Sequence, residues 1–428
     1  MCSIEFYRVR DLLLLFEEGR TENDFLSRAL SSSGRRKKGE GREMVAMSLT
    51  KEERSKVEVT LAYGARQVKK LIEVLEKGEA TVSERVEAIK LLCDVCSCQE
   101  KKSSAADERV GDIVMELLGD DEPELVLASC KLIQSLGKIF LGRKVMKGAG
   151  VFAKLVNLID ASEVHGIKLD AARCIGLMTR SPDGVECFMD IEGTVPALVR
   201  YIKAAASNAA AAATSGDTAE ATGKFEERED DSGAVACDTT TKSETDTRAI
   251  LTGTQALCGL TVRQNFLEEA LSCRAHVPII DVLRMELDDD INTACCTLLS
   301  HLCHHPEGKF ATLEAGGLYA LTPMLESSCV PVRQRATGAI AGLTIEYKAK
   351  LAAVEAAGPA LVRLVNDTDA IVACNALICI ENSCEIPQSR EAMKTFLNEE
   401  EEMRLKDFVC WPKVRQNFRK EIRPFPEE

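Results

Sequence analysis

The chain has 428 residues, of which 45% are hydrophobic and 29% charged, so it can bury a sizeable core. Only 19 residues are aromatic (13 Phe, 5 Tyr and 1 Trp), which disfavours a β-sandwich or barrel and favours a helical protein. With 54 basic and 68 acidic residues the formal net charge is −14, which disfavours a nucleic-acid partner.

Residues 1–58 are predicted to form an irregular N-terminal arm. Their apolar run, Leu12–Phe16, is shorter than the core of about 7 residues in a secretion signal or the 20 or so of a membrane span. The eighteen cysteines are spread along the chain without paired spacing, which favours free thiols over a disulfide framework. We therefore expect a reduced, intracellular protein without direct membrane insertion.

A repeat dominates the chain from residue 59 to residue 396. Seven segments align without gaps, and one column of the alignment holds only small residues: Ala88, Ser129, Ala171, Gly253, Cys295, Ala336 and Ala373. Aliphatic residues follow four and seven positions later in every segment, which is the pattern of one buried stripe on an α-helix. Each segment is therefore predicted to be a helix whose small residue allows a neighbouring helix to approach closely.

A shorter amphipathic segment precedes each of these helices, and breaks such as Gly316-Gly317 and Gly358-Pro359 are expected between helices. A period near 41 residues with two or three helices per unit is typical of armadillo and HEAT repeats. The sequence thus predicts an all-α, right-handed armadillo/HEAT-like superhelical solenoid of about seven repeats.

The spacing between the third and fourth small residues is doubled, and residues 204–248 account for it. This stretch begins with an alanine run and holds ten acidic and four basic residues, a net charge of −6. Such a composition cannot bury enough apolar surface to order itself, so a disordered acidic insertion is predicted inside the fourth repeat.

The long third helix of each unit is expected to line a groove that binds a protein partner. Trp411 is the only tryptophan and lies outside the repeats, so the Trp-based peptide clamp of importin-type proteins is not expected. The candidate partner-binding residues of the groove are Lys90, Lys131, Arg173, Thr297, His301 and Asn375. The three cations either receive an acidic segment, from a partner or from the chain's own insertion, or are ordinary solvated charges.

The C-terminal tail, residues 397–428, is basic and aromatic. Between residues 403 and 426 there are seven basic and two acidic residues, a net charge of +5, and three aromatic candidates for docking: Phe408, Trp411 and Phe418. The tail is predicted either to dock on an acidic surface, such as an assembly partner or the tubulin lattice, or to cap the apolar end of the array.

Two groups of residues have spacings that resemble metal sites. The first is Cys93, Cys96 and Cys98, and the second comprises Cys295, Cys296, His301, Cys303, His304 and His305. Their places in the repeat favour packing, and the chain has no P-loop, GxSxG or GxGxxG motif. We therefore expect no enzyme activity, metal, cofactor or small-molecule substrate; a zinc-dependent enzyme built on the second group is a minor alternative.

Two stretches carry a more specific resemblance. The tripeptide Ala62–Gly64 ahead of the first helices, and Pro306–Ala315 (PEGKFATLEA), resemble the radial spoke head protein 14 family. The resemblance covers residues 59–396 and implies an armadillo-repeat scaffold in the cytoskeleton of the cytoplasm, at the axoneme of a cilium or flagellum. Its partners would then be other radial spoke or axonemal proteins. The alternative is a cytosolic armadillo adaptor or trafficking scaffold unrelated to cilia.

Overall fold

The computed structural model describes residues 67–76, 80–107, 109–216 and 239–396, with only the backbone at 107, 213–216 and 239–243. All regular structure in these ranges is helical and comprises twenty α-helices, α4 to α23, and one 3-10 helix, η1. The predicted arm (1–58) and tail (397–428) lie outside the described residues. None of the described helices is long and apolar enough to cross a bilayer.

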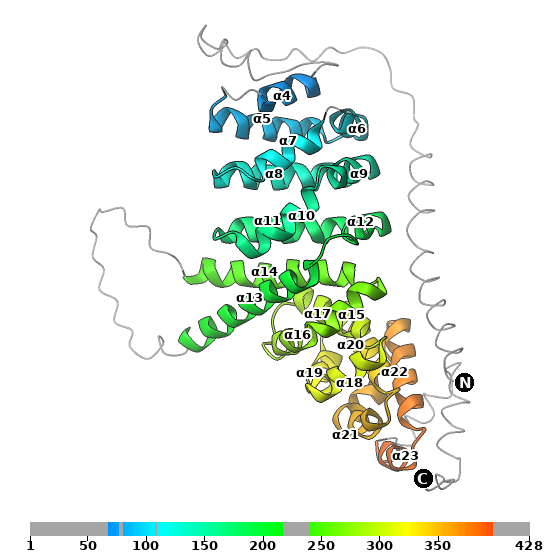
Figure 1. Ribbon diagram of the computed structural model, residues 1–428. Helices are drawn as coiled ribbons and strands as arrows, with labels where there is room; N and C mark the ends of the chain where they lie inside the picture. Colours follow the sequence, from blue (N-terminus) through cyan, green and yellow to red (C-terminus); the bar gives the residue numbers. More distant parts are fainter. Residues whose placement is uncertain (1–66, 77–79, 108, 217–238, 397–428) are drawn as a thin grey trace, which may run out of the picture. The chain divides into compact units, whose positions relative to one another are not determined.

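Seven helices correspond one for one to the seven aligned segments. These third helices are α5 (Val82–Val95), α8 (Pro123–Leu136), α11 (His165–Met178), α14 (Thr239–Leu260), α17 (Asp289–Leu302), α20 (Val330–Leu343) and α22 (Ala370–Ser383). Each packs against the next one in this order, and Figure 1 shows the stacking of α5, α8, α11 and α14. The predicted all-α solenoid with seven repeated third helices is therefore confirmed.

Shorter helices complete the units. The second helices are α4 (Gln67–Glu76), α7 (Val110–Leu117), α10 (Val151–Ala161), α13 (Thr194–Gly216), α16 (His276–Leu283) and α19 (Gly317–Leu321), which is followed by η1 (Pro323–Glu326). The first helices are α6 (Gln99–Asp107), α9 (Phe140–Gly148), α12 (Pro182–Glu186), α15 (Gln264–Ser272), α18 (Pro306–Glu314) and α23 (Pro387–Lys394). In the seventh unit one helix, α21 (Tyr347–Leu364), takes both places.

The predicted stripe of the third helices forms the core of the stack. All seven small residues are buried, and the aliphatic residues four positions later are at most 2% exposed. The close approach is clearest at Gly253, where an added Cβ would lie 2.7 Å from the Cγ1 atom of Ile202 in α13. The small column is thus a steric requirement of the contact between the second and third helices.

The fourth unit differs from the prediction. The second helix α13 has 23 residues, against 5 to 11 in the other second helices, and the third helix α14 has 22, against 14 in the other third helices. The expected disorder over 204–248 is therefore wrong at both ends. Alanine has the highest helix propensity, and Ala205 and Ala209 are buried in the extended pair. Between the two helices, the side-chain amide of exposed Asn208 donates to the carboxylate of buried Asp246 at 3.4 Å. Residues 217–238 of the insertion lie outside the described ranges.

The expected break at Gly358-Pro359 is also wrong, because α21 runs through both residues. Pro359 costs the helix one backbone hydrogen bond but leaves it continuous. Gly358 has a packing role, since an added Cβ would lie 2.7 Å from the ring of Phe396.

Ion pairs join neighbouring units at equivalent places. Arg85 in the first turn of α5 pairs with Asp120 at 3.1 Å, and Arg333 in the first turn of α20 pairs with Asp367 at 2.8 Å. Each aspartate stands three residues before the next third helix, so the same contact fixes the turn that introduces that helix.

Candidate functional site

The predicted groove position, two residues after the small column, changes character along the stack. In the first four third helices it is exposed and polar, occupied by Lys90, Lys131, Arg173 and Gln255. In the next two it is half-buried, and in α22 it is Asn375, which is 9% exposed. The side chains available to a charged partner therefore gather on α5, α8 and α11.

Carboxylates on the same helices accompany two of these cations. The Nζ atom of Lys90 lies 3.8 Å from a carboxylate oxygen of Glu87, and Arg173 donates to Asp170 at 2.9 Å. Sequence analysis passed over both carboxylates, although the spacing of three residues places such pairs on one helix face. Part of the positive charge of these groove cations is thus compensated by carboxylates on the same helices.

Asp170 links two units electrostatically. Burial raises the pKa of its carboxyl, and the positive charges of Arg173 and then Lys131 oppose that rise. Lys131 belongs to α8, whereas Asp170 and Arg173 belong to α11. The two cations therefore act on the same carboxylate across the contact between the second and third units.

The predicted groove residues of α17 are held by neighbouring groups. The Thr297 hydroxyl donates to the carbonyl of Thr293 at 2.7 Å, and His301 Nδ1 lies 3.0 Å from the Thr261 hydroxyl at the end of α14. Burial, followed by the charges of His304 and Arg335, lowers the pKa of His301 to about 4. His301 is therefore neutral at pH 7 and adds no positive charge to the groove.

Asn375 connects two third helices. Its Nδ2 atom donates to the carbonyl of Gln334 at 3.3 Å and to the hydroxyl of Thr337 at 3.4 Å, both in α20. The Asn375 side-chain amide therefore donates its hydrogen bonds to the neighbouring unit. The three predicted docking residues of the tail, Phe408, Trp411 and Phe418, lie outside the described residues.

The first cysteine group consists of packing residues and one exposed thiol. Burial raises the pKa of Cys93 to about 12 and that of Cys96 to about 11, whereas Cys98 is exposed. Protonated thiols are poor nucleophiles and poor metal ligands.

The second group also consists largely of buried packing residues. Cys295, Cys296 and Cys303 are buried, and burial raises the pKa of Cys303 to about 12. His304 instead directs its Nδ1 atom to the carbonyl of Ser300 at 2.6 Å. Within the part of the chain that the structure describes, no three His, Cys, Asp or Glu side chains are grouped so as to hold a metal ion.

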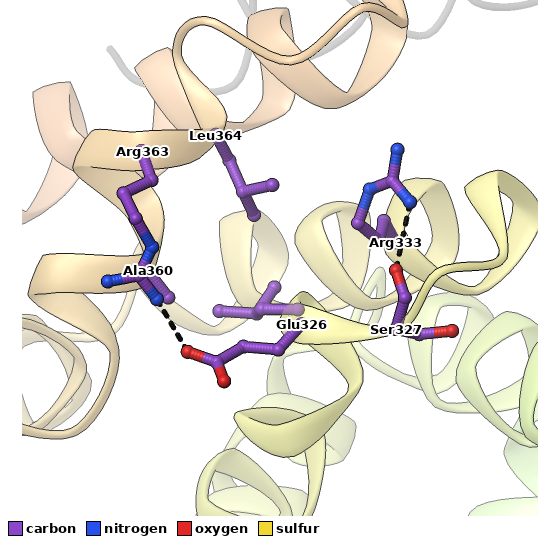
Figure 2. Close-up of a pocket in the computed structure, with 7 residues that line it drawn as sticks. Glu326, Ser327, Arg333, Ala360, Arg363 and Leu364 are labelled. Atoms are coloured by element: carbon purple, nitrogen blue, oxygen red, sulfur yellow. Dashed lines mark hydrogen bonds and ion pairs between the residues drawn. The ribbon is translucent and has the colours of Figure 1, made fainter.

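An open hollow of about 400 Å³ lies between η1, α20 and α21 (Figure 2). Its two guanidinium groups already have partners: Arg363 donates to Glu326 at 2.5 Å, and Arg333 donates to the Ser327 carbonyl at 2.8 Å. Arg333 also makes its bidentate bond to Asp367, at 2.8 and 3.1 Å. The hollow is thus built from ion pairs that hold the sixth and seventh units together.

Comparison with known proteins supports the fold and leaves the family open. No family model matches the chain, and no curated protein matches it. Two engineered proteins of the Northeast Structural Genomics Consortium are similar in structure. One has a TM-score of 0.54 at 18% identity, covering 82% of this chain and 86% of its own. The other has a TM-score of 0.50 at 17% identity, covering 64% of this chain and 98% of its own. A designed armadillo repeat protein is also matched, with a TM-score of 0.39 and 14% identity.

Proposed function

We propose that this chain is a non-enzymatic structural scaffold and protein-interaction subunit of the radial spoke complex, at the axoneme of a cilium or flagellum. The observation that carries the scaffold role is the unbroken stack of seven third helices, which presents exposed side chains of consecutive units along one protein. The axonemal assignment rests on the sequence resemblance at Ala62–Gly64 and Pro306–Ala315; the second stretch forms α18.

The binding surface of this scaffold is the basic row formed by Lys90, Lys131 and Arg173. These residues occupy the same position in three consecutive stacked helices, with Asp170 as the one partly buried carboxylate that both Lys131 and Arg173 influence. A row of cations at unit spacing fits an extended acidic segment of a partner protein, because such a segment can place one carboxylate against each unit.

The localisation of the tagged protein in a flagellated cell tests the axonemal assignment. We expect the protein to stay on axonemes after detergent extraction and to be lost from axonemes that lack spokes. A diffuse signal that is fully extracted would overturn the assignment and favour a cytosolic armadillo adaptor.

Charge reversal tests the binding surface separately. The triple variant with Lys90, Lys131 and Arg173 changed to Glu is expected to lose its axonemal retention while remaining folded. The matched control reverses three exposed lysines outside the third helices, Lys138, Lys144 and Lys203, and makes the same change in net charge. Equal retention of both variants would remove the basic row from the proposal, and equal loss would show that only total charge matters.

A further inference from the structure

A second open hollow, of about 260 Å³, lies between the fourth and fifth units. The connection between α12 and α13 lines one side of it and α15 lines the other. The lining includes Met189, Ile191, Glu192, Asn265, Phe266 and Glu269. None of these residues belongs to a third helix, so the hollow is separate from the basic row on α5, α8 and α11.

The hollow lies where the first helix of the fourth unit is short. The helix α12 has five residues, whereas the other separate first helices have eight or nine. Residues 187–193 follow it as an irregular connection, and Gly193, with a positive φ of 78°, leads into α13. Glycine adopts this left-handed conformation without the strain that a Cβ atom causes. A non-helical connection therefore presents Met189, Ile191 and Glu192 to the hollow.

Three apolar side chains line the hollow. Phe266 is 4% exposed and Ile191 is half-buried, so both contribute to the packing between the two units. Met189 is 41% exposed. A methionine side chain is unbranched and adapts its shape to a neighbouring group. An exposed methionine beside buried apolar residues is therefore suited to pack on the aliphatic stem of a long side chain from another protein.

Two carboxylates line the same hollow without a cation. Within the described part of the chain, neither Glu192 nor Glu269 makes a hydrogen bond or an ion pair through its carboxylate. Burial raises the pKa of the Glu269 carboxyl, and no charge among the described residues opposes this rise. Asp170 differs, because Arg173 and Lys131 oppose the effect of burial there. A half-buried carboxylate without a cation has lost hydration without the compensation of an ion pair, so it favours the approach of a cation.

The cations near the hollow already pair with other carboxylates. Residues 182–193 and 264–272, which include all the lining residues, contain six acidic residues and no basic one. Three neighbouring cations pair with acidic residues outside the lining: Arg143 with Asp183, Lys147 with Asp190 and Arg263 with Glu186. The negative charge of Glu192 and Glu269 is therefore complementary to a cation that comes from another molecule.

We propose that this hollow binds an arginine side chain of a protein partner. The guanidinium group donates hydrogen bonds to the carboxylates of Glu192 and Glu269, and the aliphatic stem packs on Met189 and Ile191. Arginine is the favoured cation because its five N–H donors can bond to two carboxylates at once, and because a guanidinium group is more weakly hydrated than an ammonium group. The site is independent of the proposed axonemal role, and it attracts the charge opposite to the one that the basic row attracts.

Methyl NMR spectroscopy of the full-length protein tests this site. The methionine methyl groups are labelled with ¹³C, the signal of Met189 is assigned with the variant Met189→Leu, and the peptide acetyl-Ala-Arg-Ala-amide is added. We expect the Met189 signal to shift until the site is saturated. The same peptide with citrulline in place of arginine keeps the shape without the charge, and it should bind about tenfold more weakly. Equal affinities for the two peptides overturn the proposal, as does the absence of a saturable shift with the arginine peptide.

Variants without the two charges show whether the carboxylates are responsible. Glu192→Gln/Glu269→Gln should weaken the binding of the arginine peptide about tenfold. The matched control Glu268→Gln/Glu307→Gln removes the same charge from two exposed residues outside the hollow, and it should bind as the wild type does. An unchanged signal of buried Met146 shows that each variant remains folded. Equal affinities of the two variants contradict the proposal, because the position of the carboxylates would then not matter.

Discussion

Leu257 provides a direct test of how the buried stripe stabilises the stack. It is fully buried in α14, which packs on α11, α13 and α17. The change Leu257→Ala removes three carbon atoms from this core, which lowers the free energy of unfolding by about 2.4 kcal/mol at 0.8 per carbon. The cavity that remains raises the expected loss to about 3–4 kcal/mol, because neighbouring helices close it only in part.

Urea unfolding followed by circular dichroism measures this loss. The matched control is Gln255→Ala, which changes an exposed residue two positions away in the same helix and should stay within about 0.5 kcal/mol of the wild type. A loss below about 1 kcal/mol for Leu257→Ala would refute the assignment of this stripe to the structural core. An equal effect of the two substitutions would refute it as well, since burial would then not decide the outcome.

Three further predictions concern steric and electrostatic contacts. Gly253→Val should lower the free energy of unfolding by about 2 kcal/mol, measured by the same urea titration, since its side chain would collide with Ile202; unchanged stability would contradict the close approach. Burial raises the pKa of Asp367, but the hydrogen bonds from Arg333 and a backbone amide outweigh it, so the pKa lies below its ordinary value. Arg333→Met should therefore cost about 3 kcal/mol at pH 7. A carboxyl whose pKa is lowered in the folded state stabilises the fold at pH values above its ordinary pKa, and this stabilisation is lost as the carboxylate is protonated. The cost of Arg333→Met should therefore shrink as the pH falls toward 3. A cost that is independent of pH would exclude the ion pair as its cause. The pKa of His301 is lowered from 6.5 to about 4, so the folded state disfavours the charged form and stability should fall between pH 6.5 and pH 4. His301→Gln should remove this component, which is worth about 2 kcal/mol between pH 7.5 and pH 5, from the stabilities measured at these two values; a wild type equally stable at both would refute it.

The repeat could be predicted from the sequence because one geometric rule governs every unit. The small residue at positions such as Ala171 and Ala336, with aliphatic residues four and seven places later, defines both the helix and the side that it buries. Local periodicity carries this information without knowledge of distant contacts.

The departures from the prediction depend on contacts that periodicity does not contain. The alanine run after residue 204 has the composition of a flexible stretch, yet it forms a helix because α14 extends beside it and buries Ala205 and Ala209. Pro359 signals a break, yet α21 continues through it. Asn375 occupies a predicted groove position, but the neighbouring Gln334 and Thr337 give its amide a partner between units. A gapless alignment does not fix the rotation of each helix against the next.

The extensive helix contacts in the described stack join helices of the same unit or of adjacent units, and this has an evolutionary consequence. A gene duplication that adds one whole unit, or a deletion that removes one, leaves each remaining unit with a neighbour of the kind it already had. Selection can therefore lengthen or shorten the array in steps of about 41 residues without a new solution to the folding of its core. Only the two ends need adjustment, and the distance between binding positions on different units can change while each unit is conserved.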